Sequence, residues 1–384
     1  MKASFKIENT TIEYNSDNLM SDRFSIQSVP FNYNISFVDE KQLKVELKRI
    51  SATNGEKHFV YIDNTVASLY KQSIFKGLKF FPLVAKETNK SLPVAQKLLS
   101  RLQKGNFTKK EILLSAGGGI TQDVSSFARA VFKRGIDWAY VPTTLLAMGD
   151  SCIGAKACLN YDRVKNLLGL FSAPREVLIH PGFLKTLHTR DILSGYGEII
   201  KLSIIGGTQS IEKFSEIKGS QNGKLLTNVE QMIKLSLLVK KSVIELDEYE
   251  NNIRKALNYG HTIGHAIEPL VRYKIPHGIA VSLGMIVENL IASEWGSLPQ
   301  KDAHYLNSLI FPFIGEESLR YLKNISAGDL IKNMKRDKKA SHNNIYLAAP
   351  KSIGHFDLMK VTPDNTFEKY LRATFSQLQR GTIK

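Results

Sequence analysis

The 384 residues are enough for two domains with substantial cores. With 43% hydrophobic and 23% charged residues, the composition excludes a disordered chain. The formal net charge of +16 suits a small anionic ligand, and because the Lys and Arg form no block with interleaved aromatics we expect no nucleic-acid partner.

The cysteine content and the apolar patterning indicate the cellular compartment of the protein. Cys152 and Cys158 give no disulfide framework, which is typical of a reducing compartment. Residues 1–8 lack the apolar core and cleavage site of a signal peptide. No apolar run approaches the ~18 residues that span a bilayer. We therefore expect a cytoplasmic protein with no membrane partner.

The N-terminal residues 1–50 alternate polar and apolar side chains. This alternation, clearest at 24–29 and 33–37, predicts a strand extension that forms an antiparallel hairpin or a sheet edge. Residues 58–62 then predict a short buried strand that ends at Asp63. The chain therefore begins with β structure.

Three glycines, Gly117–Gly119, lie between a predicted strand and a predicted helix. At such a junction the backbone N–H groups can approach a pyrophosphate, which the helix dipole also favours. The spacing is not GxGxxG, so a tight turn of small residues is an equally good local interpretation. Another buried strand is predicted at 138–142, and the alternation of strands and helices to about residue 180 predicts an α/β layer with a parallel sheet.

From about Leu184 the pattern changes to long helical periods, as in 199–205, 225–244 and 279–295. The second half is therefore predicted to be mainly α. We expect a first domain of residues 1–188, including the strand extension, and a second of residues 189–384. A cleft between them would be a favoured ligand site.

Three histidines fall within seventeen residues: His261, His265 and His277. His261 and His265 are four apart, so on a helix they share one face. Imidazole is the commonest metal ligand, and a catalytic zinc usually takes three protein groups. A histidine pair at this spacing is more often a solvated or hydrogen-bonded helix face, so spacing alone leaves both interpretations open.

Several short motifs follow one another in order along the chain: 117–123, 134–135, 141–146, 150–151, 154–156, 165–166, 197–201 and 254–277. Together they resemble the 3-dehydroquinate synthase family, the sugar phosphate cyclases, over roughly residues 58–350. Each motif is weak alone, but the ordered set is highly specific.

The resemblance implies an N-terminal Rossmann-like domain that binds NAD and a helical C-terminal domain that binds zinc or another divalent metal such as cobalt. Glu198, His261 and His277 match the family's three metal ligands, and His265 then lies on the phosphate side instead of binding the metal. The positions that contact NAD in the family are matched by Asp63, Glu87, Lys90, Gly118, Gly119, Asp123, Thr143, Thr144, Lys165, Thr186 and Leu187.

Substrate-binding positions of the family are also matched. Lys240 and Arg254 match the pair that holds the substrate carboxylate, and Asp150 and Lys201 match groups that contact its hydroxyls. Arg134 matches an arginine that family members lend to the neighbouring subunit, which implies a homodimer. The residues around the phosphate and the ring are matched by Lys156, Asn166, Asn258, His265 and Lys338.

The implied reaction is a phosphate-eliminating cyclisation in the shikimate pathway. In the family, NAD⁺ transiently oxidises an alcohol of 3-deoxy-arabino-heptulosonate 7-phosphate, phosphate leaves, the hydride returns, and aldol closure gives 3-dehydroquinate. Zinc polarises the reacting oxygen. Lys and Arg side chains neutralise the phosphate and the carboxylate.

Four residues depart from the family pattern. Gln122 stands where a glycine precedes the NAD-site aspartate, and its side chain is expected to crowd or re-shape the pyrophosphate loop. Ala155 and Ala157 replace the usual Gly and Thr. Ile279 stands where the family usually has Glu, so a partner of the metal ligands is expected to be missing.

These departures keep other functions open. A cyclase of another sugar phosphate is one, although Asn258 and Arg254 disfavour the 2-deoxy-scyllo-inosose type and the pair Gly264–His265 disfavours the sedoheptulose-phosphate type. A metal-dependent alcohol dehydrogenase of the iron type shares the two-domain plan. A basic binding protein on an inactive cyclase scaffold is the non-enzymatic alternative.

Overall fold

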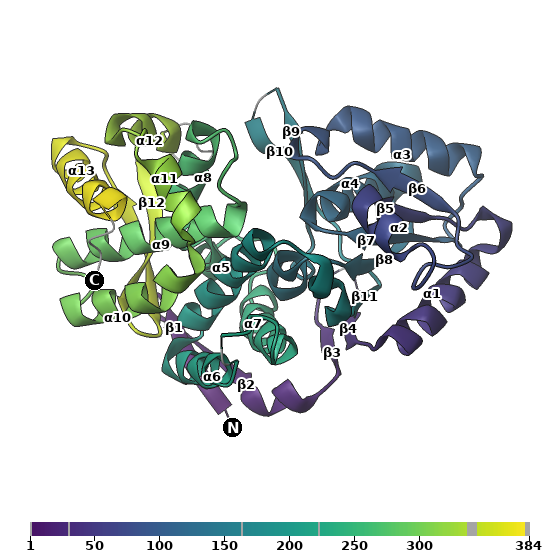
Figure 1. The fold of residues 1–384 in the computed structure, drawn as a ribbon, viewed down its shortest axis with the longest axis horizontal. Helices are drawn as coiled ribbons and strands as arrows, with labels where there is room; N and C mark the ends of the chain where they lie inside the picture. Colours follow the sequence, from purple (N-terminus) through teal and green to yellow (C-terminus); the bar gives the residue numbers. More distant parts are fainter. Residues whose placement is uncertain (1, 30, 163, 222, 336–343, 381–384) are drawn as a thin grey trace. The chain divides into compact units, whose positions relative to one another are not determined.

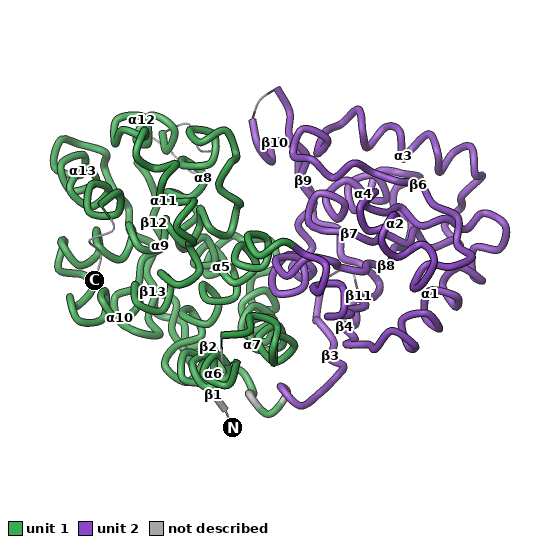
Figure 2. The backbone as a smooth tube through the Cα atoms, in the orientation of Figure 1, with its two compact units in different colours: residues 1–18, 188–384 green, residues 19–187 purple. Residues whose placement is uncertain are grey.

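The computed structural model describes residues 2–29, 31–162, 164–221, 223–335 and 344–380. The chain divides into two compact units, Leu19–Leu187 and Met1–Asn18 with His188–Lys384 (Figure 2). We expected residues 1–188 to form the first domain; the structure instead groups the first eighteen residues with the C-terminal half, because their strands pair there. No helix in the described ranges combines the length and apolarity needed to cross a membrane.

The unit Leu19–Leu187 is built on a sheet in the order β3-β4-β11-β8-β7-β5-β6 (Figure 1). All neighbours pair in parallel except β3, which is antiparallel to β4 and forms the predicted edge hairpin. This confirms the predicted parallel α/β layer. The strands are β3 (Arg23–Ile26), β4 (Tyr33–Phe37), β5 (Val60–Asp63), β6 (Phe80–Leu83), β7 (Ile112–Gly117), β8 (Asp137–Pro142) and β11 (Glu176–Ile179).

The switch point of this sheet lies between β5 and β7. These strands are neighbours, but the chain leaves β5 toward β6 and leaves β7 in the opposite direction, toward β8. Ligands of open α/β sheets bind outside the carboxyl ends of the strands at such a point. Here the two strands end at Asp63 and at Gly117, directly before the other glycines.

Helices and one hairpin complete this unit. Asp39 caps α1 through a capping box with Gln42, and Asp63 caps α2 by accepting from the N–H groups of Thr65 and Val66. Strands β9 and β10 form a separate antiparallel hairpin. The elements are α1 (Glu40–Asn54), α2 (Asn64–Tyr70), α3 (Leu92–Lys104), α4 (Gly119–Val131), β9 (Lys156–Tyr161) and β10 (Val164–Phe171).

The other unit is mainly helical, as predicted. Its central helices α5 and α9 are buried along most of their length because their apolar residues go nearly all the way round. The helices are α5 (Thr189–Ile205), α6 (Gly207–Gly219), α7 (Val229–Ile244), α8 (His261–Leu270), α9 (His277–Glu294), α10 (Gln300–Ile310), α11 (Glu316–Leu322), α12 (Ala327–Met334) and α13 (Asn365–Arg380).

A sheet in the order β12-β13-β1-β2 belongs to the helical unit. Strand β1 pairs in parallel with β13 and antiparallel with β2, and it buries Phe5 and Ile7. The helical periods of the second half did not indicate β12 and β13. The strands are β1 (Lys2–Ile7), β2 (Thr10–Asn15), β12 (Ile345–Ser352) and β13 (His355–Val361).

Candidate active site

Glycines bring three helices of the helical unit unusually close together. A Cβ added at Gly197 of α5 would lie 2.1 Å from the carbonyl oxygen of Gly278, and one at Gly278 of α9 would lie 1.8 Å from that of Ser194. A Cβ at Gly264 of α8 would lie 2.8 Å from the carbonyl oxygen of Ala280. The backbones of α5, α8 and α9 therefore meet where only glycine fits.

The expected metal ligands stand beside these contacts. Glu198 follows Gly197, His277 precedes Gly278, and His261 follows Gly260, whose φ of 77° opens α8. Glu198 is fully buried, and its Oε1 lies 3.2 Å from Nε2 of His277 and 3.6 Å from Nε2 of His261. Close backbone approach is thus what brings one carboxylate and two imidazoles from three helices to one point.

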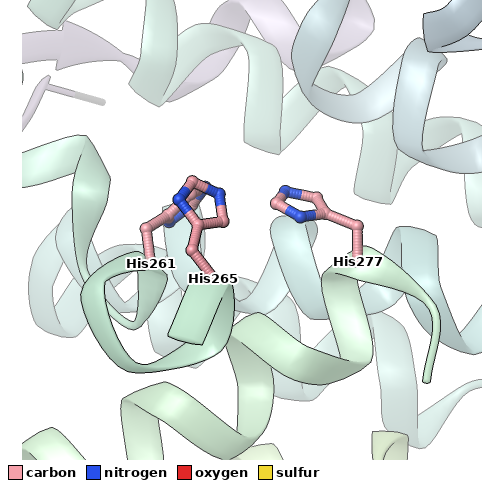
Figure 3. Close-up of side chains that lie close together, drawn as sticks. All are labelled: His261, His265 and His277. Carbon is pink, nitrogen blue, oxygen red and sulfur yellow. The ribbon is translucent and has the colours of Figure 1, made fainter. Parts of the chain in front are cut away.

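His265 points to the same place. Nitrogens of His261, His265 and His277 lie within 4.8 Å of one another, and Figure 3 shows the three rings turned toward one another from α8 and α9. Distance alone would therefore group three histidines. The matched ligand set replaces His265 by Glu198, and both sets have donors that suit a divalent cation.

The hydrogen bonds of the two matched histidines leave the same nitrogen for a metal. Nδ1 of His261 lies 3.2 Å from the carbonyl oxygen of Tyr259, and Nδ1 of His277 lies 3.4 Å from Oε1 of Glu268. In each case Nδ1 can donate its proton to an acceptor, while Nε2 faces Glu198. This donor chemistry fits a divalent metal.

Charges shift the pKa values within the cluster. Burial would raise the pKa of Glu198, but Lys201, whose Nζ lies 2.5 Å from Oε2, and His277 outweigh it and lower that pKa. Burial would lower the pKa of His277, yet its contacts with Glu198 and Glu268 raise it to about 9 in the metal-free protein. The negative charges of the carboxylates and the positive charges beside them thus stabilise each other at this site.

The residues matched to the substrate carboxylate and ring come from α7 and the segment Ile253–Asn258, which pack against each other. Lys240 and Arg254 are both buried, with 7% and 1% of their surfaces exposed. Nδ2 of Asn258 donates to Oε1 of Glu250 at 2.8 Å. Two buried cations in one unit fit an anionic ligand.

The glycine-rich turn of the other unit is shaped for a close approach by a ligand. A Cβ at Gly118 would come within 2.9 Å of the Thr144 side chain, and Gly118 is the N-cap of α4. Thr143 donates its backbone N–H to the carbonyl oxygen of Gly117 at 3.0 Å. The first amides of α4 and the ends of β7 and β8 therefore form a cradle that suits a pyrophosphate.

A half-buried polar cluster lies beside this turn. Nζ of Lys90 lies 2.5 Å from Oδ2 of Asp123 and donates to Oδ1 of Asn166 at 2.6 Å. Burial would lower the pKa of Lys90, but Asp123 outweighs it and raises that pKa. Glu87 lies 3.8 Å from Nζ of Lys165. The cluster thus contains five predicted residues that come from separate stretches of the sequence: Glu87, Lys90, Asp123, Lys165 and Asn166.

The side chain of Gln122, which departs from the family pattern, bonds to Ser151. Its Nε2 donates to the carbonyl oxygen of Ser151 at 2.6 Å, and its Oε1 accepts from Oγ of Ser151 at 2.7 Å. The side chain therefore holds the π-helical turn Ala147–Ser151, which carries Asp150, against α4. The amide thus has its partners on Ser151, and the expected effect of Gln122 on the pyrophosphate loop stays a prediction.

The other predicted residues lie at the ends of elements or in turns. Lys156 begins the hairpin at β9 and is exposed, and Thr186, whose Oγ1 is 3.0 Å from Oη of Tyr70, ends a short helical segment before Leu187. Arg134 is exposed in a turn where Lys133, Arg134 and Gly135 all have positive φ. Lys338 lies outside the described residues.

Sequence reasoning missed three carboxylates near these residues. Glu268 lies against His277, Glu250 accepts from Asn258, and Oε2 of Glu288 accepts from the N–H of Gly260 at 2.8 Å. Glu268 carried a usable signal, since it follows His265 by three residues and shares its helix face. Glu288 carried none, because its partner lies 28 residues away.

A parallel sheet with a glycine-lined switch point and a helical unit with a buried carboxylate–imidazole cluster define a nucleotide- and metal-dependent class of enzyme. Two family models match, 3-dehydroquinate synthase N-terminal over residues 80–194 and 3-dehydroquinate synthase C-terminal over residues 195–340. The chain belongs to the 3-dehydroquinate synthase family.

Individual relatives support the same family membership. The 3-dehydroquinate synthase of Clostridium acetobutylicum is 34% identical over 334 residues, which cover 85% of this chain and 92% of that protein. The one from Streptococcus equi subsp. equi is 31% identical over 362 residues, covering 92% and 99%. A 2-deoxy-scyllo-inosose synthase structure, complexed with carbaglucose-6-phosphate, NAD+ and Co2+, has a TM-score of 0.79 at 23% identity, covering 91% of this chain and 99% of that one. This last likeness is one of fold.

Proposed function

We propose that the protein is a carbon–oxygen lyase that converts 3-deoxy-arabino-heptulosonate 7-phosphate into 3-dehydroquinate and phosphate. One structural observation supports the proposal in addition to family membership. The helical unit holds a buried carboxylate–imidazole cluster on α5, α8 and α9 together with two buried cations, Lys240 and Arg254. A substrate that carries both hydroxyls for a metal and a carboxylate for the cations matches this pairing.

The cofactors of the proposed reaction are NAD and a divalent metal, zinc or cobalt. When bound, NAD would accept and return one hydride, and the metal would polarise the oxygen at the reacting carbon. Glu198, His261 and His277 would hold the metal. The nucleotide would lie along Asp63, the turn of Gly118 and Gly119, and the residues matched to it beside them: Glu87, Lys90, Asp123, Thr143, Thr144, Lys165, Thr186 and Leu187.

The chain's own residues would bind and orient the substrate. Lys240 and Arg254 would hold the carboxylate, and Arg254 can do so with two parallel hydrogen bonds. His265 would lie on the phosphate side, where an imidazole can move a proton as phosphate leaves. Asp150 and Lys201 would contact hydroxyls, and Lys156, Asn166, Asn258 and Lys338 would surround the phosphate and the ring.

A homodimer belongs to the same proposal. Arg134 is exposed at the tip of a turn, and such a side chain is free to reach a second copy. A substitution of Arg134 by Ala should therefore impair activity in a way that mixed dimers with a site-inactive variant partly restore. We place the protein in the cytoplasm, since its two cysteines, Cys152 and Cys158, give no disulfide framework.

The decisive experiment is inorganic phosphate release with catalytic NAD⁺ and zinc. Three substrates are compared: 3-deoxy-arabino-heptulosonate 7-phosphate, sedoheptulose 7-phosphate and glucose 6-phosphate. We expect release from the first alone, without net NADH, and loss of release on chelation. Release only from another sugar phosphate would contradict the proposed substrate, and net NADH from an alcohol without phosphate release would indicate a dehydrogenase.

A further inference from the structure

Glu268 is a buried carboxylate of the metal cluster to which no role was assigned. It lies on α8, three residues after His265, and only 2% of its surface is exposed. Its Oε1 lies 3.4 Å from Nδ1 of His277 on α9. The two residues therefore connect the two helices that carry the histidines.

The contact fixes which nitrogen of His277 points into the cluster. Oε1 of Glu268 lies on the Nδ1 side of the ring, where an N–H can donate to it. Nε2, on the other side of the ring, faces Oε1 of Glu198 at 3.2 Å and so points into the cluster. The imidazole is also held in one orientation, because both of its nitrogens have partners.

The local sequence leaves this task to Glu268. Ile279, two residues after His277, is 2% exposed and its side chain has no hydrogen-bond acceptor. The carboxylate that supports His277 therefore comes from the neighbouring helix. Glycine contacts such as that of Gly264 with Ala280 bring α8 and α9 near enough for this to happen.

We propose that Glu268 is the positioning residue of the metal site, which orients His277 so that Nε2 points to the place where a divalent cation would bind. The inference rests on the metal site of the proposed function. Glu268 does not itself bind the metal; it acts through His277. A carboxylate behind an imidazole ligand typically strengthens metal binding by about 10- to 100-fold.

The test is the zinc affinity of the metal-free protein, measured by competition with a chromophoric chelator and without any turnover. In Glu268→Gln the amide oxygen can still accept from Nδ1 but the charge is gone, so we expect affinity to fall about tenfold. In Glu268→Leu the acceptor is lost, so we expect a fall nearer 100-fold. Glu294→Gln, on the exposed end of α9, is the matched control and should bind zinc like the wild type.

A spectroscopic readout separates positioning from a general loss of structure. The visible bands of the cobalt-loaded protein report the geometry of the ligands, so a reoriented His277 should change them in Glu268→Leu, which has lost the acceptor, while circular dichroism stays unchanged. If Glu268→Leu does not fold, the zinc affinity of the Gln variant decides. Wild-type zinc affinity in a folded Glu268 variant, or an unchanged cobalt spectrum in folded Glu268→Leu, would overturn the inference.

The outcomes also distinguish this inference from the proposed function. If the wild type binds zinc and the Glu268 variants bind it weakly, the positioning role stands even when no sugar phosphate yields phosphate. If phosphate release is found as proposed but zinc affinity does not depend on Glu268, only the positioning role fails.

Discussion

Ala155 adopts a backbone conformation that suits glycine better. Its φ is 57°, and it follows Gly154 at 92° in the turn that leads to Lys156. A left-handed conformation costs an L-residue about 1–2 kcal/mol because Cβ approaches the following carbonyl oxygen. The turn is kept nonetheless, since the carbonyl oxygen of Ala155 accepts from the N–H of Ser172 at 2.6 Å.

We therefore expect Ala155→Gly to stabilise the protein by about 0.5–1 kcal/mol, the relief of strain being partly offset by the extra freedom of glycine in the unfolded chain. Urea unfolding measures the change. Ala157→Gly is the matched control, because Ala157 is fully buried in β9 without positive φ and the same substitution should destabilise there. A destabilised Ala155→Gly would contradict the argument.

At the scale of elements, the glycine contacts of α5, α8 and α9 determine the geometry of the site. Gly278→Ala would place a methyl group 1.8 Å from the carbonyl oxygen of Ser194, so α9 must move away from α5. We expect a loss of about 3 kcal/mol in stability and weaker zinc binding, since His277 moves with the helix.

Thermal unfolding and chelator competition measure both effects. Gly219→Ala is the control: Gly219 ends α6, and its added Cβ would meet nothing within 4 Å. That variant should be neutral or slightly more stable. Full zinc affinity in Gly278→Ala would show that the helix contact does not position the ligand.

The entry to β7 depends on one carboxylate. Glu111 accepts from Nζ of Lys57 at 2.8 Å and from Thr108, and although burial would raise the pKa of Glu111 these bonds lower it to about 2. Because the folded-state pKa is below the usual 4.5, the stabilisation is present above about pH 4.5 and is lost as the pH falls toward 2.

We expect Glu111→Gln to lower the free energy of unfolding near pH 6 by about 2–3 kcal/mol and to lessen the loss of stability between pH 5 and pH 3. Urea unfolding as a function of pH measures this. The exposed Glu56→Gln should leave the pH profile as it is. If Glu111→Gln lost stability between pH 5 and pH 3 as steeply as the wild type does, this prediction would be contradicted.

At the scale of the whole molecule, the N-terminal strands belong to the helical unit. Phe5, Ile7, Ile12 and Tyr14 are buried there, and β1 lies between β13 and β2. Deletion of residues 2–15 should therefore lower the melting temperature of the helical unit and weaken zinc binding, because apolar surface of that unit becomes exposed.

Calorimetry with zinc and with NAD separates the two units in this test. We expect NAD affinity to be retained, since the residues matched to NAD in the family lie in Leu19–Leu187. Lys6→Gln, on the exposed side of β1, is the control and should melt like the wild type. A deletion variant that loses NAD binding but keeps zinc binding would contradict the assignment of these strands.

Much of the fold followed from local patterns, and the rest depends on contacts between distant residues. The strand–glycine–helix order around Gly117 and the buried strand at Asp63 were readable because period and turn residues are local signals. The pairing of β1 with β13, and the hydrogen bond of Glu288 with Gly260 across 28 residues, left no local trace. Most expected site residues fall into clusters, but their roles remain predictions.

The parallel pairing of Lys6 with His355 has a consequence for synthesis on the ribosome. Strand β1 leaves the exit tunnel long before β13, so it cannot be enclosed until β13 has been made. Leu19–Leu187 can fold in the meantime, because the described strands of its sheet end at Ile179. Strand β1 is thus synthesised early and enclosed late, and a nascent chain stalled before residue 355 exposes a β-hairpin that a chaperone can recognise.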